Sequence, residues 1–332
     1  MKILIVTQVV DKEHPILGFF HRWIEEFAKR CEQVHVICLQ EGKHSLPANV
    51  TVHSLGKESG KGRLTYLLRF YTYIWKYRKE YDSVFVHMNQ VYVILGAPLW
   101  RLSGKKIKLW YMHGSVPFTL RIAEKLAHKI FTGSSESFRI KSEKVIVTGH
   151  GIDTARFAPQ AVPKTIDLIT VGRITPSKNL ITLIETIAGL QEKKRVSLVI
   201  VGSAVTEDEL RYEKQLHDKV RKLHLEDVIT FKGKVTQSEL PTILSGAKVF
   251  VTVAQNGSLD KAVLEAMSCG LPVVSMAPGT SSLPLSVAQT STKEEFLEQL
   301  ERVISSISIV PDYVTYIKET HSLQKLIPKI LK

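Results

Sequence analysis

The feature that most constrains the fold is an alternation of short β-branched runs with stretches of helical spacing along the 332-residue chain. In the first half, the runs predict strands at residues 3–7, 34–38, 84–87, 107–112, 129–132 and 144–147, and helices at 18–30 and 118–128. The pattern then starts again, with strands expected at residues 166–171, 196–201, 228–231, 249–253 and 273–275. Strands that alternate with helices favour parallel, doubly wound sheets, so the predicted fold class is α/β.

The break in this pattern at residues 160–164 contains a proline and is expected to link two domains. A chain of this length can form two domains of ordinary size, each with its own hydrophobic core. We therefore expect an N-terminal domain at residues 1–160 and a C-terminal domain at residues 161–314, both Rossmann-like.

Neither a membrane span nor a secretory leader is expected. The longest apolar stretch, residues 91–100, is too short to span a bilayer and contains glycine and proline. Residues 1–7 lack the basic segment of a signal peptide and are predicted to form a strand. Cys31, Cys38 and Cys269 lack the spacing of a metal site and are expected to be buried thiols of a cytoplasmic protein.

The net charge of +13 is concentrated in the N-terminal half. Residues 1–160 carry 24 Lys and Arg against 13 Asp and Glu, whereas the rest of the chain carries 21 against 19. The densest portion, residues 57–79, interleaves basic and aromatic side chains on an expected helix, which suits the headgroups of an anionic membrane. A helix whose rings pack on the sheet and whose charges are solvated is the alternative. No nucleic-acid partner is expected, because no motif for one accompanies the charge.

A candidate phosphate site follows the strand at residues 166–171. Gly172, Arg173 and Lys178 come after this strand, at the edge where open α/β sheets bind ligands. A helix is expected from Asn179, and its N-terminus would offer unpaired N–H groups and a positive dipole end. A guanidinium fork and an ammonium group in this place predict a diphosphate site that needs no metal. Two solvated surface cations are the alternative.

A second block, residues 257–274, follows the strand at 249–253. The apolar positions of its helix fall on one face and leave Glu265 near the edge where the strands end. A carboxylate there can accept two hydrogen bonds from a ribose diol. An ordinary surface glutamate is the alternative, and residues 270–272 end the helix with a glycine and a proline.

Together these segments resemble the family 4 retaining glycosyltransferases, which have the GT-B fold and use a nucleotide-diphospho-sugar donor. The resemblance covers roughly residues 1–280, and its separate segments are jointly specific. Arg173 and Lys178 match the diphosphate-binding pair of the family. Glu265 matches the second of its two glutamates, the ribose ligand. Gly172, between the strand and this pair, is implied to be part of the donor site.

Three further segments in the N-terminal half extend the resemblance. Gly18 matches the glycine of the first loop over the donor phosphates, and His113 matches a histidine that contacts the donor sugar. Residues 148–153, with Phe157 and Pro159, resemble the signature at the junction of the two domains. The implied catalytic residues are Arg173, Lys178 and His113; His87 and His150 are weaker candidates.

One departure from the family concerns its first glutamate, which would fall at Gly257. No side chain is available there to contact a sugar hydroxyl. Asp260 or Ser258 is expected to take over that contact, with Lys261 adding charge near the phosphates. An ordinary helix N-cap is an equally good interpretation of Asp260.

The resemblance implies two facing domains separated by a cleft, whose closure excludes water from a reactive sugar. The donor is expected on the C-terminal domain, and a glycan or lipid-linked acceptor on the N-terminal domain, to which residues 315–332 would return. Transfer is expected to retain the anomeric configuration without a cofactor or metal, and the chain contains no Asp-x-Asp pair. The resemblance also implies a role in polysaccharide synthesis and a location at the inner face of the cell membrane.

Two other functions remain open. A sugar-nucleotide epimerase of the same fold would act without an acceptor, and a degenerate relative, suggested by Gly257, would bind membrane or glycan without catalysis. A dinucleotide dehydrogenase is disfavoured, because no Gly-x-Gly-x-x-Gly turn follows the first strand.

Overall fold

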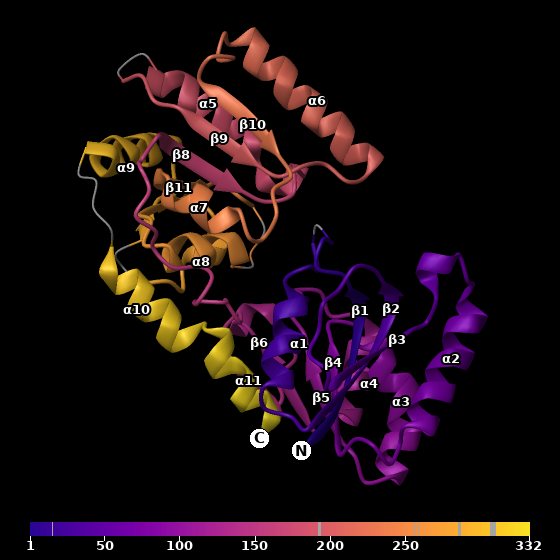
Figure 1. The fold of residues 1–332 in the computed structure, drawn as a ribbon. Coiled ribbons are helices and arrows are strands. Elements are labelled where there is room, and N and C mark those ends of the chain that lie inside the picture. Colours follow the sequence, from indigo (N-terminus) through magenta and orange to yellow (C-terminus); the bar gives the residue numbers. More distant parts are fainter. Residues whose placement is uncertain (15, 192–193, 256, 258, 285–286, 306–309) are drawn as a thin grey trace. The chain divides into compact units, whose positions relative to one another are not determined.

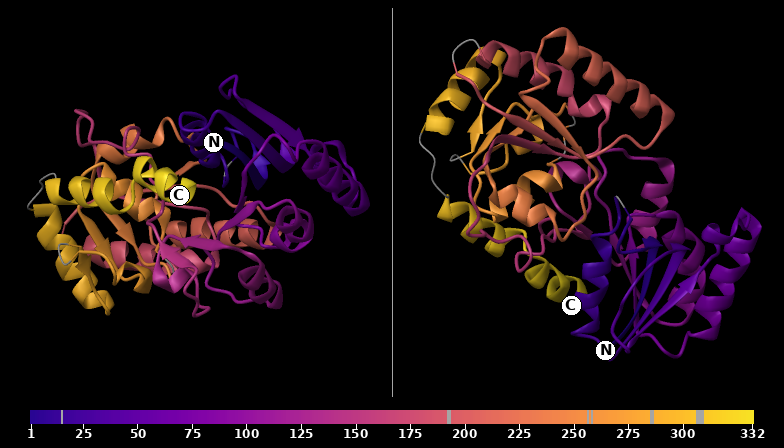
Figure 2. Two further views of the ribbon diagram at one scale, coloured as in Figure 1. Left: turned by 90° about the horizontal axis from the view of Figure 1, so that it is seen from below. Right: turned by 45° about the horizontal axis from the view of Figure 1, so that its top comes forward.

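The computed structural model describes residues 1–14, 16–191, 194–255, 257, 259–284, 287–305 and 310–332. The chain divides into two compact units. The N-terminal unit comprises Met1–Asp153 and Thr320–Lys332, and the C-terminal unit comprises Thr154–Glu319. Each unit is a parallel sheet covered by helices, as Figures 1 and 2 show.

The described part of the N-terminal unit contains a seven-stranded sheet in the order β3-β2-β1-β4-β5-β6-β7, with every neighbouring pair parallel. Its strands are β1 Lys2–Val10, β2 Gln33–Glu41, β3 Val50–Ser54, β4 Ser83–His87, β5 Lys106–Trp110, β6 Lys129–Thr132 and β7 Val145–Val147. Its helices are α1 Phe20–Ala28, α2 Arg63–Lys76, α3 Val91–Leu102, α4 Phe118–Leu126 and α11 Leu323–Leu331.

Both faces of this sheet are buried, which explains the nearly continuous apolar runs of its central strands. Ile3 and Ile5 of β1 pack with α1 and α11, whereas Leu4 and Val6 face α2, α3 and α4. Successive side chains of a strand point to opposite faces, so one run of residues supplies two cores. Figure 1 shows the two helical layers on either side of the sheet.

The C-terminal unit contains, among its described residues, a six-stranded parallel sheet in the order β10-β9-β8-β11-β12-β13. Its strands are β8 Ile166–Val171, β9 Leu198–Val201, β10 Ile229–Gly233, β11 Ala247–Thr252, β12 Val273–Ser275 and β13 Ala288–Gln289. Its helices are α5 Leu180–Gln191, α6 Glu207–Lys222, α7 Leu240–Ser245, α8 Lys261–Ser268 and α9 Lys293–Ser305, followed by α10 Pro311–Thr320. Buried side chains of α5, α6 and α9 pack with those of β8, β9 and β11.

The predicted parallel α/β class is confirmed, and each predicted strand is present. Two short edge strands, β3 and β13, were not predicted. The first helix begins at Phe20 instead of Gly18, because residues before Phe20 form a turn in which the Gly18 N–H donates to the His14 carbonyl oxygen at 3.0 Å. The three cysteines are buried, as expected.

Residues 149–153 lie against the last helix of the N-terminal unit. The Ile152 N–H donates to the His321 carbonyl oxygen at 2.7 Å, and the Leu323 N–H donates to the Ile152 carbonyl oxygen at 2.8 Å. Gly149 has a φ of 81°, and a Cβ there would lie 2.1 Å from the Thr320 carbonyl oxygen. The backbone approaches too closely for any residue but glycine at position 149.

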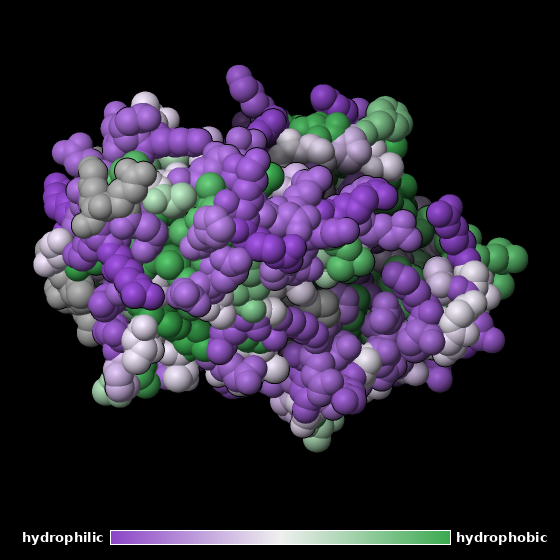
Figure 3. Space-filling model, turned by 90° about the horizontal axis from the view of Figure 1, so that it is seen from above, coloured by the Kyte–Doolittle hydropathy of each residue, from purple (hydrophilic) through white to green (hydrophobic). Residues whose placement is uncertain are grey.

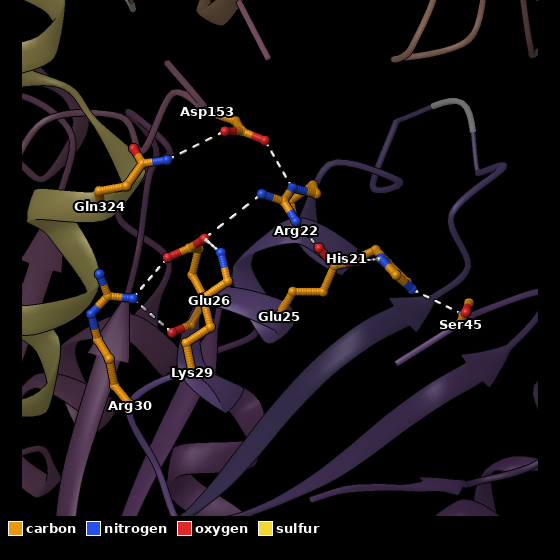
Figure 4. A network of polar contacts seen from close by, with 9 residues as sticks. All are labelled: His21, Arg22, Glu25, Glu26, Lys29, Arg30, Ser45, Asp153 and Gln324. Carbon is orange, nitrogen blue, oxygen red and sulfur yellow. Dashed lines mark hydrogen bonds and ion pairs between the residues drawn. The ribbon is translucent and has the colours of Figure 1, made fainter. Parts of the chain in front are cut away.

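A polar network joins α1 to this segment (Figure 4). Arg22 Nε donates to Asp153 Oδ2 at 2.8 Å, and Gln324 of α11 donates to the other Asp153 oxygen at 3.4 Å. Glu26 of α1 is buried and accepts from Lys29 and Arg30. Burial alone would raise the pKa of Glu26, but the two cationic donors hold it below its ordinary value. The network therefore fixes Asp153, the last residue before the chain leaves this unit.

The last helix is also held from its C-terminal end. Lys108, buried in β5, donates from Nζ to the carbonyl oxygens of Ile330 at 2.6 Å and Leu331 at 3.0 Å. These carbonyls have no partner within the helix and form its negative dipole end. Burial lowers the pKa of Lys108 to about 8. Among the described residues, no helix combines the length and apolar composition needed to cross a bilayer.

Candidate donor site and its surroundings

In the loop after β8, the side chain of Lys178 lies over the backbone of Gly172. A Cβ on Gly172 would lie 2.9 Å from Lys178 Cε and 3.1 Å from Nζ, so the lysine side chain lies over the bare backbone. The neighbouring loop after β9 is equally close, because a Cβ on Gly202 would lie 1.9 Å from the Gly172 carbonyl oxygen. The two glycines thus allow the loops at the carboxyl ends of β8 and β9 to pack together.

Lys178 ends a 3₁₀ turn, Pro176–Lys178, that precedes α5. Its Nζ lies 2.6 Å from Asp260 Oδ2, and each of the two side chains is 19% exposed. The Gln255 N–H donates to the Ser177 carbonyl oxygen at 2.9 Å, so backbone and side chains both join the loops after β8 and β11. Asn179, in left-handed conformation with a φ of 52°, turns the chain from the 3₁₀ turn into α5.

Asp260 is at the N-cap position of α8, but its side chain makes no capping hydrogen bond. Asp260 is thus the N-cap residue by position, while its carboxylate forms an ion pair with Lys178. Gly257 is exposed, and no described atom lies within 4 Å of the place where its Cβ would be. Ser258 lies outside the described residues.

Glu265 is on the second turn of α8 and is only 4% exposed. Lys261, one turn earlier, places Nζ 3.0 Å from Glu265 Oε1. This contact lacks hydrogen-bond geometry, and Glu265 Oε1 is a buried oxygen without a hydrogen-bond donor in the described part of the chain. Buried carboxylate oxygens are normally hydrogen-bonded, so this oxygen can still accept a donor from a ligand.

Arg173, two residues after the end of β8, pairs with a residue that we did not predict for the site. Its Nε lies 3.1 Å from Oε1 of Glu209 on α6. The Arg173 side chain is 45% exposed, whereas that of Glu209 is 8% exposed. The sequence signal was the pattern Thr206-x-x-Glu209, a capping box that begins α6, although this pattern does not reveal the partner of the carboxylate.

The three cations predicted for the donor site are thus each paired with a carboxylate. Arg173 pairs with Glu209, Lys178 with Asp260, and Lys261 with Glu265. These side chains come from the carboxyl ends of three adjacent strands, β9, β8 and β11, and from the helices that follow them. An incoming anion would meet locally balanced charge, and it can replace a carboxylate as the partner of a cation.

Two predicted site residues, Gly18 and His113, are in the N-terminal unit. A Cβ on Gly18 would lie 2.7 Å from the His14 carbonyl oxygen and 2.9 Å from that of Lys12, so the turn itself requires glycine. His113 is exposed after β5, and its Nδ1 lies 2.8 Å from Ser115 Oγ. In the described residues, its Nε2 has no protein partner and is free to contact a ligand.

His87 and His150, the weaker candidates, are both buried. The His87 ring stacks on Phe20 at 3.9 Å between centroids, and its Nδ1 lies 3.2 Å from Thr7 Oγ1. Burial lowers the pKa of His87 to about 3, so the ring is neutral near pH 7. The His150 N–H donates to His321 Nδ1 at 3.3 Å, and burial lowers the pKa of His321 to about 4. Both rings belong to the core of the N-terminal unit.

The surface of α2 combines apolar and basic side chains. Leu64, Leu68 and Trp75 are 71%, 61% and 56% exposed, and their spacing places them on one face of the helix. Phe70 and Ile74 are buried on the opposite side. Exposed basic residues accompany them on and around the helix: Lys57, Lys61, Arg63, Lys76 and Lys79. Figure 3 shows hydrophobic beside hydrophilic side chains at its right-hand margin, the side on which α2 lies in Figure 1.

No cluster of three or more His, Cys, Asp and Glu side chains in the described parts of the chain could hold a metal ion. The described residues therefore provide no candidate metal ligands.

Two family models match the chain. Residues 151–284 match the family described as glycosyl transferases group 1, and residues 17–140 match the family described as glycosyl transferase 4-like. The first match contains the residues predicted for a donor site in the C-terminal unit, from Gly172 to Glu265. The second contains Gly18 and His113.

Curated relatives include a putative colanic acid biosynthesis glycosyltransferase, WcaL, of Escherichia coli K12, 29% identical over 158 residues. This match covers 44% of this chain and 37% of the relative. A second relative in Escherichia coli is UDP-Gal:alpha-D-GlcNAc-diphosphoundecaprenol alpha-1,3-galactosyltransferase, 26% identical over 243 residues, or 62% of this chain and 60% of that protein. The chain spans less than two thirds of the length of either relative.

Solved structures with a similar fold include Anabaena Alr3699/HepE in complex with UDP, with a TM-score of 0.80 at 19% identity. The match covers 100% of this chain and 98% of that one. Sucrose-phosphate synthase from Thermosynechococcus elongatus matches with a TM-score of 0.79 at 14% identity, over 99% of this chain and 97% of the other. The two sheets match those of GT-B structures, which confirms the predicted fold.

Proposed function

Because the chain belongs to the group 1 glycosyl transferases, we propose that it transfers a hexosyl group from a nucleotide-diphospho-sugar to a glycan or lipid-linked acceptor. The observation that supports this proposal most directly is the cationic pair Arg173 and Lys178 at the carboxyl end of β8, with Gly172 leaving space for the lysine. The UDP bound by the Anabaena protein and the UDP-galactose in the name of the Escherichia coli relative favour a nucleotide-sugar donor.

The proposed role of Arg173 and Lys178 is to bind the donor diphosphate and to stabilise the charge that grows on it as the glycosidic bond breaks. Preorganised cations aimed at developing charge are usually the largest single contribution to catalysis. A guanidinium fork and an ammonium group supply this without a metal. Lys261 adds a third cation within the same unit.

Glu265 is proposed to hold the donor ribose. Its buried Oε1 lacks a hydrogen-bond donor among the described residues, and a ribose hydroxyl would supply one. The donor sugar is proposed to contact the segment that contains Gly257, Ser258 and Asp260. From the N-terminal unit, we assign Gly18 to the donor phosphates and His113, through its free Nε2, to the sugar.

We propose that the anomeric configuration is retained. The leaving phosphate oxygen takes the proton of the acceptor hydroxyl as the new glycosidic bond forms on the same face of the sugar. In this scheme the protein positions the reactants and supplies no nucleophile of its own.

The N-terminal unit is proposed to bind the acceptor at an anionic membrane surface, through the exposed apolar and basic side chains of α2. Amphipathic helices with basic residues beside leucine and tryptophan bind at the headgroup level. Cosedimentation with phosphatidylglycerol vesicles tests this. Changing Leu64, Leu68 and Trp75 together to Ser should abolish binding, whereas Leu210→Ser, at a 54% exposed residue of α6, should not. Equal binding by both variants would refute a role for α2.

The transfer reaction is tested in two steps. Thermal unfolding is first followed with UDP, GDP, dTDP and ADP, each with magnesium and with EDTA. A nucleotide at about one hundred times its Kd should add about 2.7 kcal/mol to the free energy of unfolding. The sugar conjugate of the selected nucleotide is then incubated with and without lipid-linked acceptors, and the products are identified.

Acceptor-dependent release of the nucleoside diphosphate in EDTA is the expected result. Isomerised donor in the absence of acceptor would identify an epimerase instead. The degenerate alternative is favoured by the missing side chain at Gly257, and vesicle binding without any nucleotide-induced shift would support it.

A further inference from the structure

Glu209 places a carboxylate beside Arg173, one of the two cations that we propose for binding the donor diphosphate. We propose that Glu209 is a positioning residue, which holds Arg173 so that the outer N–H groups of the guanidinium face the donor diphosphate. This inference rests on the proposed function. It adds a residue outside the catalytic and donor-binding set.

The Glu209 carboxylate is fixed by the backbone. Its Oε2 accepts from the Val205 N–H at 2.9 Å and from the Thr206 N–H at 3.2 Å. The Glu209 N–H donates in turn to Thr206 Oγ1 at 3.4 Å, which completes a capping box at the start of α6. The whole residue is buried. Its geometry is therefore set by the helix and does not depend on Arg173.

The carboxylate uses one oxygen for the helix and the other for the arginine. Oε1 contacts Arg173 through Nε, at 3.1 Å. Nε is the inner N–H of the guanidinium, so the terminal nitrogens remain available. Within the described residues, no other hydrogen bond or ion pair engages Arg173, and its side chain is 45% exposed.

Arg22 in the N-terminal unit shows the contrasting arrangement. Its guanidinium contacts Asp153, Glu25 and Glu26 through Nε and both terminal nitrogens, as Figure 4 shows. An arginine with all three guanidinium nitrogens engaged stabilises a structure. Arg173, in contact through Nε only, keeps both terminal nitrogens for a planar, bidentate contact with phosphate oxygens.

The orienting role has a physical reason. An arginine side chain has many rotamers, and fixing one of them costs conformational entropy each time a ligand binds. A buried carboxylate that fixes the guanidinium beforehand reduces this cost. The position of Arg173 then persists from the donor complex to the transition state, where charge on the diphosphate is largest.

The test compares two substitutions in the same capping box. Glu209→Gln keeps the cap, because a glutamine oxygen can accept from the Val205 and Thr206 N–H groups, but its amide then presents N–H to Arg173 Nε. Thr206→Ala removes the capping hydroxyl and leaves the carboxylate with both backbone donors and Arg173. The first variant removes the hold on Arg173, and the second perturbs only the helix.

We expect Glu209→Gln to lower kcat/KM for the donor about 10-fold or more and to weaken nucleoside diphosphate binding, with nucleoside monophosphate binding unchanged. Thr206→Ala should lower the Tm with kcat/KM unchanged. In an Arg173→Ala background, Glu209→Gln should have no further effect on kcat/KM, because the carboxylate acts through the arginine.

Equal kinetic effects of the two capping variants would overturn the proposal, as would a full effect of Glu209→Gln in the Arg173→Ala background. A wild-type chain that binds no nucleoside diphosphate would refute the proposed function itself. A wild type that binds and turns over donor, with a Glu209→Gln variant that behaves identically, would refute only the role of Glu209.

Discussion

The ion pair between Lys178 and Asp260 makes the consequence of one substitution depend on the other. Lys178→Ala removes a cation from the proposed diphosphate site and leaves the Asp260 carboxylate facing the incoming phosphates. Lys178→Ala with Asp260→Asn removes both charges. The double variant should therefore bind nucleoside diphosphate more tightly than Lys178→Ala alone, although it carries more changes.

The magnitudes follow from charge and exposure. A hydrogen bond to a charged group contributes about 1.5–3 kcal/mol, which Lys178→Ala loses. Two unit charges about 6 Å apart at an effective dielectric constant of about 20 interact by about 3 kcal/mol. Because Asp260 is 19% exposed, we reduce the repulsion between its carboxylate and a phosphate to about 1–2 kcal/mol. The double variant should thus recover roughly 5- to 30-fold in affinity.

Asp260→Asn by itself separates the two roles left open for this residue. If the carboxylate only occupies Lys178 until an anion replaces it, the variant should bind both UDP and UDP-sugar more tightly, by several-fold. If Asp260 also contacts the sugar, UDP affinity should rise while UDP-sugar affinity falls. Both predictions assume that thermal shifts identify UDP as the preferred nucleotide.

Isothermal titration of the four proteins at two salt concentrations gives the coupling free energy of this cycle. Circular dichroism controls for the fold. A double variant that binds nucleoside diphosphate no more tightly than Lys178→Ala alone would refute the reasoning, because the Asp260 carboxylate would then have no bearing on anion binding. Near-normal turnover by a folded Lys178→Ala variant would refute the phosphate-binding role of the lysine.

Three further predictions concern stability and ribose binding. His87 stays neutral in the folded protein, with a pKa of about 3, whereas in the unfolded chain it titrates near 6.5; stability is therefore lost as pH falls. Between pH 7 and pH 5, the free energy of unfolding measured in urea should fall by about 2 kcal/mol more for the wild type than for His87→Gln. Equal falls for the two proteins would contradict this. Gly149→Ala should lower the free energy of unfolding in a chemical denaturation assay by about 2–4 kcal/mol, because the new Cβ would collide with the Thr320 carbonyl oxygen. The control Gly60→Ala should lower it by only about 1 kcal/mol, because Gly60 has a φ of 68° but open space around its Cβ position. Glu265→Gln should weaken UDP binding by about 1–3 kcal/mol and 2′-deoxy-UDP binding by less, because the deoxy nucleotide keeps only the 3′-hydroxyl of the diol; equal losses for both nucleotides would exclude a contact with the 2′-hydroxyl.

The strands of both sheets were predictable because their residues are apolar on both faces. Runs such as those of β1 and β8 have no alternating polar positions, which is the pattern of a buried parallel strand. The edge strand β3, with the sequence VTVHS, is short and mostly half-buried or exposed, and β13 has only two residues. Edge strands of this kind owe their conformation to a neighbour and lack a pattern of their own.

The positions of the candidate cations were also predictable, since residues that follow parallel strands meet at one edge of a sheet. Their carboxylate partners were not. Glu209 is 36 residues from Arg173, and Asp260 is 82 residues from Lys178. No local pattern reports a contact over such a separation. The capping box revealed where α6 begins, but not that the second oxygen of its glutamate faces an arginine of the neighbouring loop.

The departure at Gly257 can be explained in the same terms. No described atom lies within 4 Å of the place where a Cβ at Gly257 would be, so the described residues leave space for a side chain there. The charge of this loop stands instead three and four residues later, on Asp260, which holds Lys178, and on Lys261, which holds Glu265. Gly257→Glu would add a carboxylate to a loop whose cations are already paired. With Asp260 in place, we expect this variant to bind nucleoside diphosphate more weakly than the wild type. Only when Asp260 is also replaced by Asn do we expect Gly257→Glu to raise the preference for the sugar nucleotide over the nucleoside diphosphate.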